Sequence, residues 1–471
     1  MIAKVVLRVP PVLDRVYDYI IPEDLKVKEG QRVIVPFGKE KKEGLVVELT
    51  TSSTISELKQ ISKVLEDEPL LNNELLELAS WMHKHYLSPL GACVYAMIPA
   101  GMDLVCTRFY YLKKEGWDEY IQKKDPGLFL SADLKTIYQA VQRGTTEDKI
   151  GVDIARRLER LDLVYSKEEW HQKGVRLKTR KGYIQQDASK ASTTKQETVV
   201  EVLKDGPLAV EDILTRTNIS TAVLHTLEKN KAIKPLYLPV RRNPLSTREI
   251  EKTKPLVLNR EQELALNDIL KGEGPYLLFG ITGSGKTEVY LQAIQKALQQ
   301  GKQALVLVPE IALTSQMVDR FVGRFGSRVA VLHSGLGIGE RYDEWQRVKN
   351  NEADVVVGAR SAVFAPLNKL GIIIVDEEHE DSYKQDEKLP YYNACEVAEF
   401  RAKWHQVRLV LGSATPAIET YQRALDGKIG LGKLKNRATN QSLPKVHVVD
   451  MREELKTGNR TIFSSKLREA L

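Results

Sequence analysis

The 471-residue sequence has few cysteines and no long apolar run. Its three cysteines, Cys93, Cys106 and Cys395, lack C-x-x-C spacing, which argues against a disulfide framework or a zinc site. No window approaches the ~20 uninterrupted apolar residues of a membrane span. The opening residues "MIAKVVLRVPPV" lack the apolar core of a signal peptide. We therefore expect a cytoplasmic protein with no membrane partner.

A strong charge of one sign is also missing. The 70 Lys and Arg residues exceed the 63 Asp and Glu residues only slightly, and the formal charge is +7. Such a balance fits a nucleic-acid partner without requiring one. The hydrophobic fraction of 42% is sufficient for buried cores, and the length predicts roughly three or four folded units.

The first unit is predicted to be rich in β-strands. Between residues 5 and 49, apolar and polar residues alternate in short runs broken by Pro and Gly, such as "RVYDYIIP" and "QRVIVPFG". A helical stretch, "LLNNELLELASWMHKHYLSPL", follows. We place the end of this unit at residue 102.

The middle third, residues 103–242, is expected to be a winged-helix-like unit. Its clearest segment, "GPLAVEDILTRTNISTAVLHTLEKNKAIKPLYLPVRR", predicts two helices joined by a short turn and followed by strands. Such units bind DNA or proteins, and the sequence leaves both possibilities open. Residues 243–255 are predicted to be a linker.

The third unit is predicted to be a doubly wound α/β domain over residues 256–440. Near-continuous apolar runs, including "YLLFG", "ALVLVP", "DVVVGA", "GIIIVD" and "LVLGSA", alternate with amphipathic helices. Runs of this kind indicate a parallel sheet that is covered by helices on both faces. This architecture is typical of nucleotide-binding domains.

The stretch "YLLFGITGSGKTEVYLQAI" contains a phosphate-binding loop pattern between a predicted strand and a predicted helix. Its backbone N–H groups would surround the phosphates at the positive end of the helix, and the lysine would reach the β- and γ-phosphates. The threonine hydroxyl would hold Mg²⁺. A chance glycine turn is the alternative, and the flanking elements disfavour it. The expected nucleotide contacts are Gly280, Thr282, Gly283, Ser284, Gly285, Lys286 and Thr287.

The stretch "GIIIVDEEHE" would supply the acidic half of the site. Asp376 follows a buried strand and would bind Mg²⁺, while Glu377 would polarise the attacking water. A solvated acidic turn is possible, but it would leave the phosphate loop without its metal partner. Lys286, Asp376 and Glu377 are therefore the catalytic candidates.

Further segments have the order found in helicases. Gln262 precedes the phosphate loop, and its amide can both donate to and accept from an adenine edge. Ser413, Ala414 and Thr415 form a strand-to-helix turn of the kind that couples nucleotide to DNA in superfamily 2 helicases. Polar residues at two other helix starts are suited to DNA phosphates, although ordinary capping explains them too. These residues are Thr314, Arg360 and Ser361.

Taken in order, these motifs resemble the PriA family of bacterial replication-restart helicases. The resemblance rests on "GITGSGKTEVY", "LVPEIALTSQM", "LHSGL", "GARSAVFAPL", "VDEEHEDSYKQ" and "GSATPAIET", and on "RVPPVLDRVYDYIIP" and "RVIVPFGK" near the N-terminus. It implies a RecA-like helicase lobe that uses ATP and Mg²⁺ to move 3′ to 5′ on DNA and that restarts replication at stalled forks. The implied partners are forked DNA with a leading-strand 3′ end, single-stranded DNA, primosome and helicase-loading proteins, and single-stranded DNA-binding protein. The implied location is the bacterial nucleoid.

The resemblance also implies two groups of DNA contacts. The N-terminal unit would hold the terminal nucleotide with Tyr17, Asp18, Tyr19, Gly38 and Lys59. Because the two tyrosines alternate in a strand, we expect at least one to be structural. An aromatic-rich loop would stack on single-stranded DNA, unless its tyrosines only pack the loop down. Its candidates are Tyr383, Lys384, Tyr391 and Tyr392.

The family's second motor lobe and its zinc-binding cysteines do not occur within these residues, and residues 441–471 are expected to begin that lobe. We expect the sequence to be part of a longer protein. An arginine from a second lobe is typically worth ~10³ to 10⁵ in rate, so this chain alone should bind ATP and hydrolyse it very slowly. A non-catalytic fork-binding module that senses ATP is one alternative. A double-stranded DNA translocase or an RNA helicase is another, although "DEEH" rather than "DEAD" favours DNA.

Overall fold

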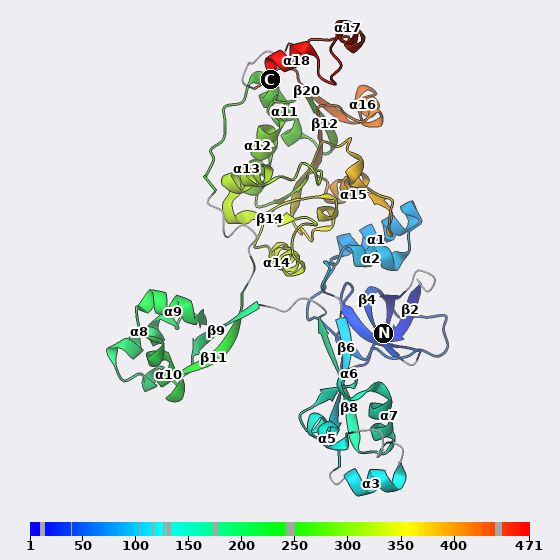
Figure 1. Cartoon of the computed structure of the whole chain (residues 1–471), viewed down its shortest axis with the longest axis vertical. Helices are drawn as coiled ribbons and strands as arrows, with labels where there is room; N and C mark the ends of the chain where they lie inside the picture. The colour runs from blue at the N-terminus through cyan, green and yellow to red at the C-terminus, as the bar shows by residue number, and fades with distance from the viewer. Residues whose placement is uncertain are drawn as a thin grey trace.

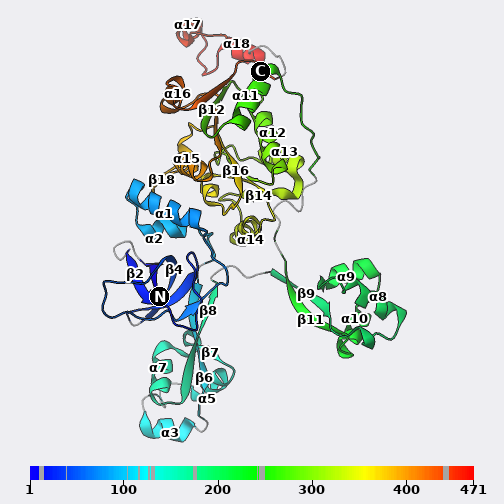
Figure 2. The ribbon, with the colours of Figure 1, turned by 180° about the vertical axis from the view of Figure 1, so that it is seen from behind.

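A computed structural model describes the chain except for residues 10–14, 39, 103, 115–116, 126–127, 129–132, 173–177, 241, 243–249 and 439–444. The N-terminal sheet lies near the middle of an elongated molecule (Figure 1). The α/β unit lies at one end, and two smaller helix–sheet units project from the other side, as the reverse view in Figure 2 also shows. Among the described residues, no helix has the length and apolar character needed to cross a bilayer.

The N-terminal unit is a five-stranded antiparallel sheet in the order β2-β1-β4-β3-β5. The alternation in the sequence places one set of side chains, including Val5, Val33 and Val46, in a buried core. Helices α1 (Asn73–Tyr86) and α2 (Leu90–Ala96) follow the sheet. The strands are β1 (Ile2–Leu7), β2 (Val16–Ile20), β3 (Arg32–Phe37), β4 (Glu40–Thr50) and β5 (Lys63–Val64).

Residues 103–242, expected to be a single winged-helix-like unit, contain two separate hydrophobic cores. In each unit a long central strand pairs with a two-residue strand on one side and a second long strand on the other. The first comprises β6 (Leu104–Leu112), α3 (Trp117–Lys124), α5 (Leu134–Gln142), β7 (Thr145–Thr146), α6 (Glu147–Ile150), α7 (Val152–Arg160) and β8 (Val164–Gln172). The second comprises β9 (Lys178–Gln185), α8 (Thr194–Val202), β10 (Leu208–Ala209), α9 (Val210–Thr217), α10 (Thr221–Lys229) and β11 (Ile233–Val240). The expected helix-turn-helix is α9–α10, and the first unit repeats its topology.

The α/β unit has a seven-stranded parallel sheet in the order β14-β15-β13-β16-β19-β12-β20. Helices cover both faces, and the predicted fold class is confirmed. The strands are β12 (Gly274–Gly280), β13 (Gln303–Leu307), β14 (Val329–Leu332), β15 (Val355–Gly358), β16 (Leu370–Asp376), β19 (Arg408–Ser413) and β20 (Gly430–Leu434). The helices are α11 (Arg260–Lys271), α12 (Lys286–Gln299), α13 (Ser315–Phe325), α14 (Ile338–Lys349), α15 (Ala394–His405) and α16 (Ile418–Leu425), with α17 (Met451–Lys456) and α18 (Ser465–Ala470) beyond the sheet.

The N-terminal helices and the α/β unit share one hydrophobic core. Side chains from α1 and α2 belong to the same buried cluster as those on the face of the parallel sheet that α15 covers. Beside this cluster, the buried guanidinium of Arg401 on α15 pairs with Glu74 on α1, with Nε 2.5 Å from Oε1 and Nη2 3.0 Å from Oε2. These contacts hold the two units together as one body.

The strand order determines where the polar motifs meet. Strands β16, β19 and β12 are adjacent and parallel, so their carboxyl ends lie at one edge of the sheet. Those ends are Asp376, Ser413 and Gly280. Three motifs that are far apart in the sequence therefore form a single site.

Candidate nucleotide and nucleic-acid sites

The glycine-rich turn between β12 and α12 forms an open phosphate-binding loop. Gly283 and Gly285 have φ angles of 80° and 84°, a region that side-chain-bearing residues rarely adopt. A Cβ atom at Gly285 would also lie 2.3 Å from the Gln262 amide nitrogen. The Lys286 ammonium donates to the Gly280 carbonyl at 2.9 Å and lies 3.8 Å from Glu377 Oε1. The loop geometry thus requires glycines and holds the lysine between the backbone and the acidic motif.

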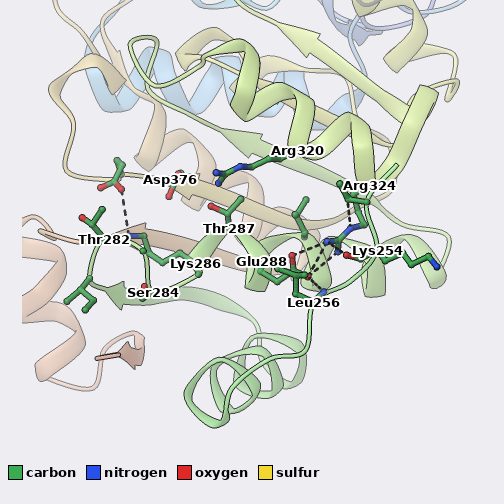
Figure 3. Close-up of a pocket in the computed structure, with 16 residues that line it drawn as sticks. Lys254, Leu256, Thr282, Ser284, Lys286, Thr287, Glu288, Arg320, Arg324 and Asp376 are labelled. Carbon is green, nitrogen blue, oxygen red and sulfur yellow. Dashed lines mark hydrogen bonds and ion pairs between the residues drawn. The ribbon is translucent and has the colours of Figure 1, made fainter. Parts of the chain in front are cut away.

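A cavity of about 660 Å³ opens in front of this loop (Figure 3). Its walls are the phosphate loop, the acidic motif, the segment before α11 and one side of α13. The buried Ser284 hydroxyl at its edge has no partner among the described residues. The volume of the cavity and its position at the first turn of α12 fit a nucleoside triphosphate. The lining residues are Thr253, Lys254, Leu256, Ile281, Thr282, Gly283, Ser284, Gly285, Lys286, Thr287, Glu288, Leu291, Arg320, Arg324, Asp376 and Glu377.

The two acids of the predicted motif face this cavity. Burial raises the pKa of Asp376, and the charge of Glu377 raises it further, while Tyr290 and Lys286 act in the opposite direction. Glu377 has a φ angle of 47°, a strained left-handed conformation for a residue with a side chain. Mg²⁺ usually takes one or two protein ligands and completes its shell with phosphate oxygens and water. Thr287 and Asp376, which lie close together in Figure 3, fit that requirement.

Tyr290 positions the Asp376 carboxylate, a role that no sequence motif indicates. Its buried hydroxyl donates to Asp376 Oδ1 at 3.0 Å. Burial raises the pKa of Tyr290 well above its ordinary value, so the hydroxyl keeps its proton. A Cβ atom at Gly412 would lie 1.6 Å from this hydroxyl, which explains the glycine before Ser413.

Replacing Tyr290 with Phe is expected to weaken Mg²⁺-dependent nucleotide binding about tenfold, because a hydrogen bond to a charged group is lost. The change can be measured by titrating a fluorescent ATP analogue with and without Mg²⁺. Tyr276→Phe, at a buried tyrosine on the neighbouring strand β12 that does not contact Asp376, is the matched control. An equal loss with and without Mg²⁺ would contradict the role assigned to Tyr290.

His379 joins the acidic motif to the Ser413-Ala414-Thr415 turn. Its Nδ1 lies 2.8 Å from Ser413 Oγ and its Nε2 lies 3.2 Å from Thr415 Oγ1. Glu378 accepts from Ala417 N at 2.7 Å on the same turn. Because these hydrogen bonds join the two motifs, a displacement of the acidic motif would also displace the Ser413-Ala414-Thr415 turn. His379 is the fourth letter of "DEEH", which is the signal in the sequence that could have identified it.

Gln262 is placed differently from its expected role. Its buried side chain closes a capping box at the start of α11, with Oε1 accepting from Asn259 N at 2.8 Å. Its Nε2 donates to the Ser284 carbonyl at 2.8 Å. Because both ends of the amide have partners within the protein, the structure does not support the expected contact with an adenine edge. Gln262 instead supports the phosphate loop through its hydrogen bond to the Ser284 carbonyl.

The candidate residues of the N-terminal unit fall into two groups. The Lys59 ammonium donates to the Gly38 carbonyl at 3.4 Å, and Tyr17 packs edge-on against Phe37, which precedes Gly38. Asp18 accepts from Ser53 Oγ at 2.5 Å, and strand alternation directs it away from Tyr17. Tyr17, Gly38 and Lys59 are thus close together, and Asp18 lies on the opposite face of its strand.

Tyr19 is the structural tyrosine of the pair. Its side chain is 4% exposed, and its hydroxyl donates to the Pro36 carbonyl at 3.2 Å. Burial, together with the neighbouring Tyr17, raises its pKa to about 12. It therefore cannot stack on a nucleotide, which corrects its inclusion among the expected DNA contacts.

Comparison with known proteins agrees with this division into units. Residues 4–99 match the family described as the PriA 3'DNA-binding domain (3'BD), and residues 259–424 match the DEAD/DEAH box helicase family. The "Replication restart protein PriA" of Bacillus subtilis is 41% identical over 98% of this chain and 58% of its own length. The protein of the same name from Synechocystis is 34% identical over 98% of this chain and 58% of its own length. The chain belongs to the PriA family.

The chain spans somewhat more than half the length of these PriA relatives. Among solved structures, the Hef helicase domain of Pyrococcus furiosus is 21% identical over 38% of this chain and 38% of its own. Its TM-score of 0.29 is too low to carry an argument.

The aromatic-rich loop expected from the PriA resemblance is mostly packed down. Tyr383 is 1% exposed and donates to the Asp376 carbonyl at 2.6 Å, while Tyr392 packs against Phe364 with ring centres 5.0 Å apart. Both are corrected from DNA contacts to internal supports. Tyr391 is exposed, and Lys384 is exposed and paired with Asp381 at 3.1 Å. These two residues remain the candidates for single-stranded DNA.

The helix-start candidates also divide. The Thr314 side chain accepts from Met317 N and caps α13, which is the ordinary capping role. The Arg360 guanidinium donates to the carbonyls of Ser382, at 3.2 Å, and Lys384. It therefore holds the aromatic-rich loop in place. Ser361 is exposed and remains a candidate for a DNA phosphate.

Proposed function

We propose that this chain is the fork-binding and nucleotide-binding part of an ATP-dependent 3′-to-5′ DNA helicase that restarts replication at stalled or abandoned forks. The observation that carries the proposal is a single chain in which a strand-end-binding unit and a phosphate-loop unit share one core. The similarity to proteins named "Replication restart protein PriA" supports replication restart as the function of the helicase. The proposed partners are forked DNA, single-stranded DNA, single-stranded DNA-binding protein, and the primosome and helicase-loading proteins.

In the proposed mechanism the residues of this chain bind the nucleotide, orient its phosphates and polarise the attacking water. The loop N–H groups and Lys286 would bind the phosphates, and Thr287 and Asp376 are the residues that would hold Mg²⁺. ATP with Mg²⁺ would supply the β–γ phosphoanhydride bond, and its hydrolysis to ADP and phosphate would drive movement. Glu377 accepts a proton from the attacking water, and its strained backbone directs the carboxylate into the cavity. His379 transmits the state of this site to the Ser413-Ala414-Thr415 turn.

The strand-end part of the proposal is tested with forks that differ only at the leading-strand 3′ end. We expect a free 3′ hydroxyl to bind about tenfold more tightly than a 3′ phosphate, because the phosphate removes the hydrogen-bond donor of the terminal nucleotide and adds charge that must be desolvated. Fluorescence anisotropy with the two labelled forks measures the ratio. Lys84→Ala, an exposed change on α1, serves as the control. Equal affinities for the two forks would remove the strand-end assignment.

A further inference from the structure

Arg320 on α13 is a cation that lines the nucleotide cavity and has no assigned role. Its side chain is exposed, and within the described part of the chain it makes no hydrogen bond or ion pair. Figure 3 shows the side chain on α13 pointing toward Thr287 and Asp376. An isolated surface arginine is usually directed at solvent, so its placement here needs a physical reason.

Arg324 shows how α13 is held at this position. One turn after Arg320, its guanidinium pairs with Glu288 at 2.9 Å and is almost fully buried. The same guanidinium donates to the Thr253 hydroxyl at 3.3 Å and to the Lys254 carbonyl at 3.0 Å. Because Glu288 lies in the first turn of α12, this pair aligns α13 with the start of the phosphate-loop helix.

The spacing of the two arginines then places Arg320. Residues four apart on a helix share one face, so Arg320 lies on the face that Arg324 presses against α12. It is one turn nearer to the N-terminus of α13 and borders Thr287 in Figure 3. Glu288 is already neutralised by Arg324, and Lys286 lies close to Glu377. Arg320 and Lys254 are the cavity-lining cations with no ion pair among the described residues, and Arg320 is the one whose side chain points toward Thr287 in Figure 3.

We propose that Arg320 contacts the terminal phosphate of a bound nucleoside triphosphate from the same unit that carries the phosphate loop. The proposal rests on the proposed function, in which this cavity holds the nucleotide. Thr287 and Asp376 mark the metal side of the site, where the β- and γ-phosphates lie. A guanidinium can donate two parallel hydrogen bonds to phosphate oxygens, which an ammonium cannot reproduce. Arg320 therefore distinguishes a triphosphate from a diphosphate.

The test compares the binding of a non-hydrolysable ATP analogue and of ADP, both with Mg²⁺, to wild type, Arg320→Ala and Arg320→Lys. We expect Arg320→Ala to weaken triphosphate binding by about tenfold or more and ADP binding by less than about threefold, with Arg320→Lys in between. Arg328→Ala is the matched control, because Arg328 is an exposed arginine of the same unit that pairs with Asp354 outside the cavity. Thermal unfolding of each variant should match wild type.

Each other outcome has a definite meaning. If wild type binds both nucleotides and Arg320→Ala binds the triphosphate equally well, the proposal for Arg320 is wrong while the proposed function stands. An equal loss for triphosphate and diphosphate would also overturn the contact with the terminal phosphate. If wild type binds neither nucleotide, the proposed function fails, and the assignment of Arg320 fails with it.

Discussion

Replacing Lys286 with Ala is expected to weaken ATP binding by about 100-fold, because charge-assisted hydrogen bonds to the phosphates are lost. The lysine is held by the Gly280 carbonyl at 2.9 Å, so its ammonium is already directed across the loop before any nucleotide arrives. Isothermal titration with ATP and Mg²⁺ measures the change directly. Hydrolysis with and without forked DNA, measured beside it, reports whether the chain turns ATP over.

Lys296→Ala provides the matched control for this change. Lys296 lies in the last turn of the same helix, is exposed, and does not line the cavity. Its replacement should leave ATP affinity unchanged within about twofold, as is usual for an exposed site without specific contacts. Equal effects at Lys286 and Lys296 would show that the cavity in front of the loop is not the nucleotide site.

The second large effect is expected at the buried pair between α1 and α15. Arg401 is fully buried, and its guanidinium also donates to the Val363 carbonyl at 2.7 Å and the Ala365 carbonyl at 3.0 Å. Arg401→Met leaves the Glu74 carboxylate buried without its main partner, which costs about 3–5 kcal/mol. Hydrogen exchange of the α1 amides and urea unfolding should both report the loss.

Two further variants separate the contributions of burial and of charge to the stability lost in Arg401→Met. Arg423→Met breaks a half-exposed pair between Arg423 on α16 and Glu399 on α15, and should cost less than about 1 kcal/mol. The double variant Glu74→Leu/Arg401→Met should recover much of the loss, because two apolar side chains replace two buried charges. A double variant as unstable as Arg401→Met would assign the loss to packing.

The same pair gives the stability a defined dependence on pH. Burial alone would raise the pKa of Glu74, but the charge of Arg401, the nearby His405 ring 3.0 Å away and the hydrogen bonds from Arg401 lower it to about 2. Because this folded-state pKa lies below the unfolded value of about 4.3, the contribution is present above pH ~4.3 and is lost as the pH falls towards 2. In Arg401→Met the lone buried carboxyl favours its protonated form. Wild type and variant should therefore converge in stability as the pH falls from 7 to 3.

The sequence predicted the parts of the site that are local in the chain. The phosphate loop needs a strand, glycines that adopt left-handed angles and a helix start, and all of these occur within residues 274–299. The acidic motif is likewise defined by one buried strand end. Both motifs follow the carboxyl ends of parallel strands of one sheet, so a parallel sheet alone places them at the same edge.

Contacts across the fold could not be predicted in this way. Tyr290 sits in a helix pattern that reads as ordinary core, and only the packing of β16 beside β19 shows that its hydroxyl meets Asp376. Tyr383 and Tyr392 look alike in sequence to the exposed Tyr391, because burial in a loop has no periodicity. Gln262 can read a base or brace a loop, and only the position of Ser284 decides between the two.

The repeated helix–sheet units were missed for a different reason. Their common topology is defined by strand order, while the segments "TTEDKIGVDIARRLERLDLVY" and "LAVEDILTRTNISTAVLHTLEKN" share few letters. Each keeps only a pattern of buried positions, such as Leu158 in the first and Leu227 in the second. Patterns of this kind are compatible with many helix pairs, so one copy was predicted and the other was not.

The shared core beneath α1 and α2 has a consequence for how DNA could move. A strand end held by the N-terminal sheet would keep a constant separation from the carboxyl edge of the parallel sheet for as long as α1 and α2 stay packed in the core that they share with it. Travel along DNA would then have to come from the duplex being drawn past a stationary end. The captured terminus would serve as the fixed reference point, and the opposite strand would be the one that advances.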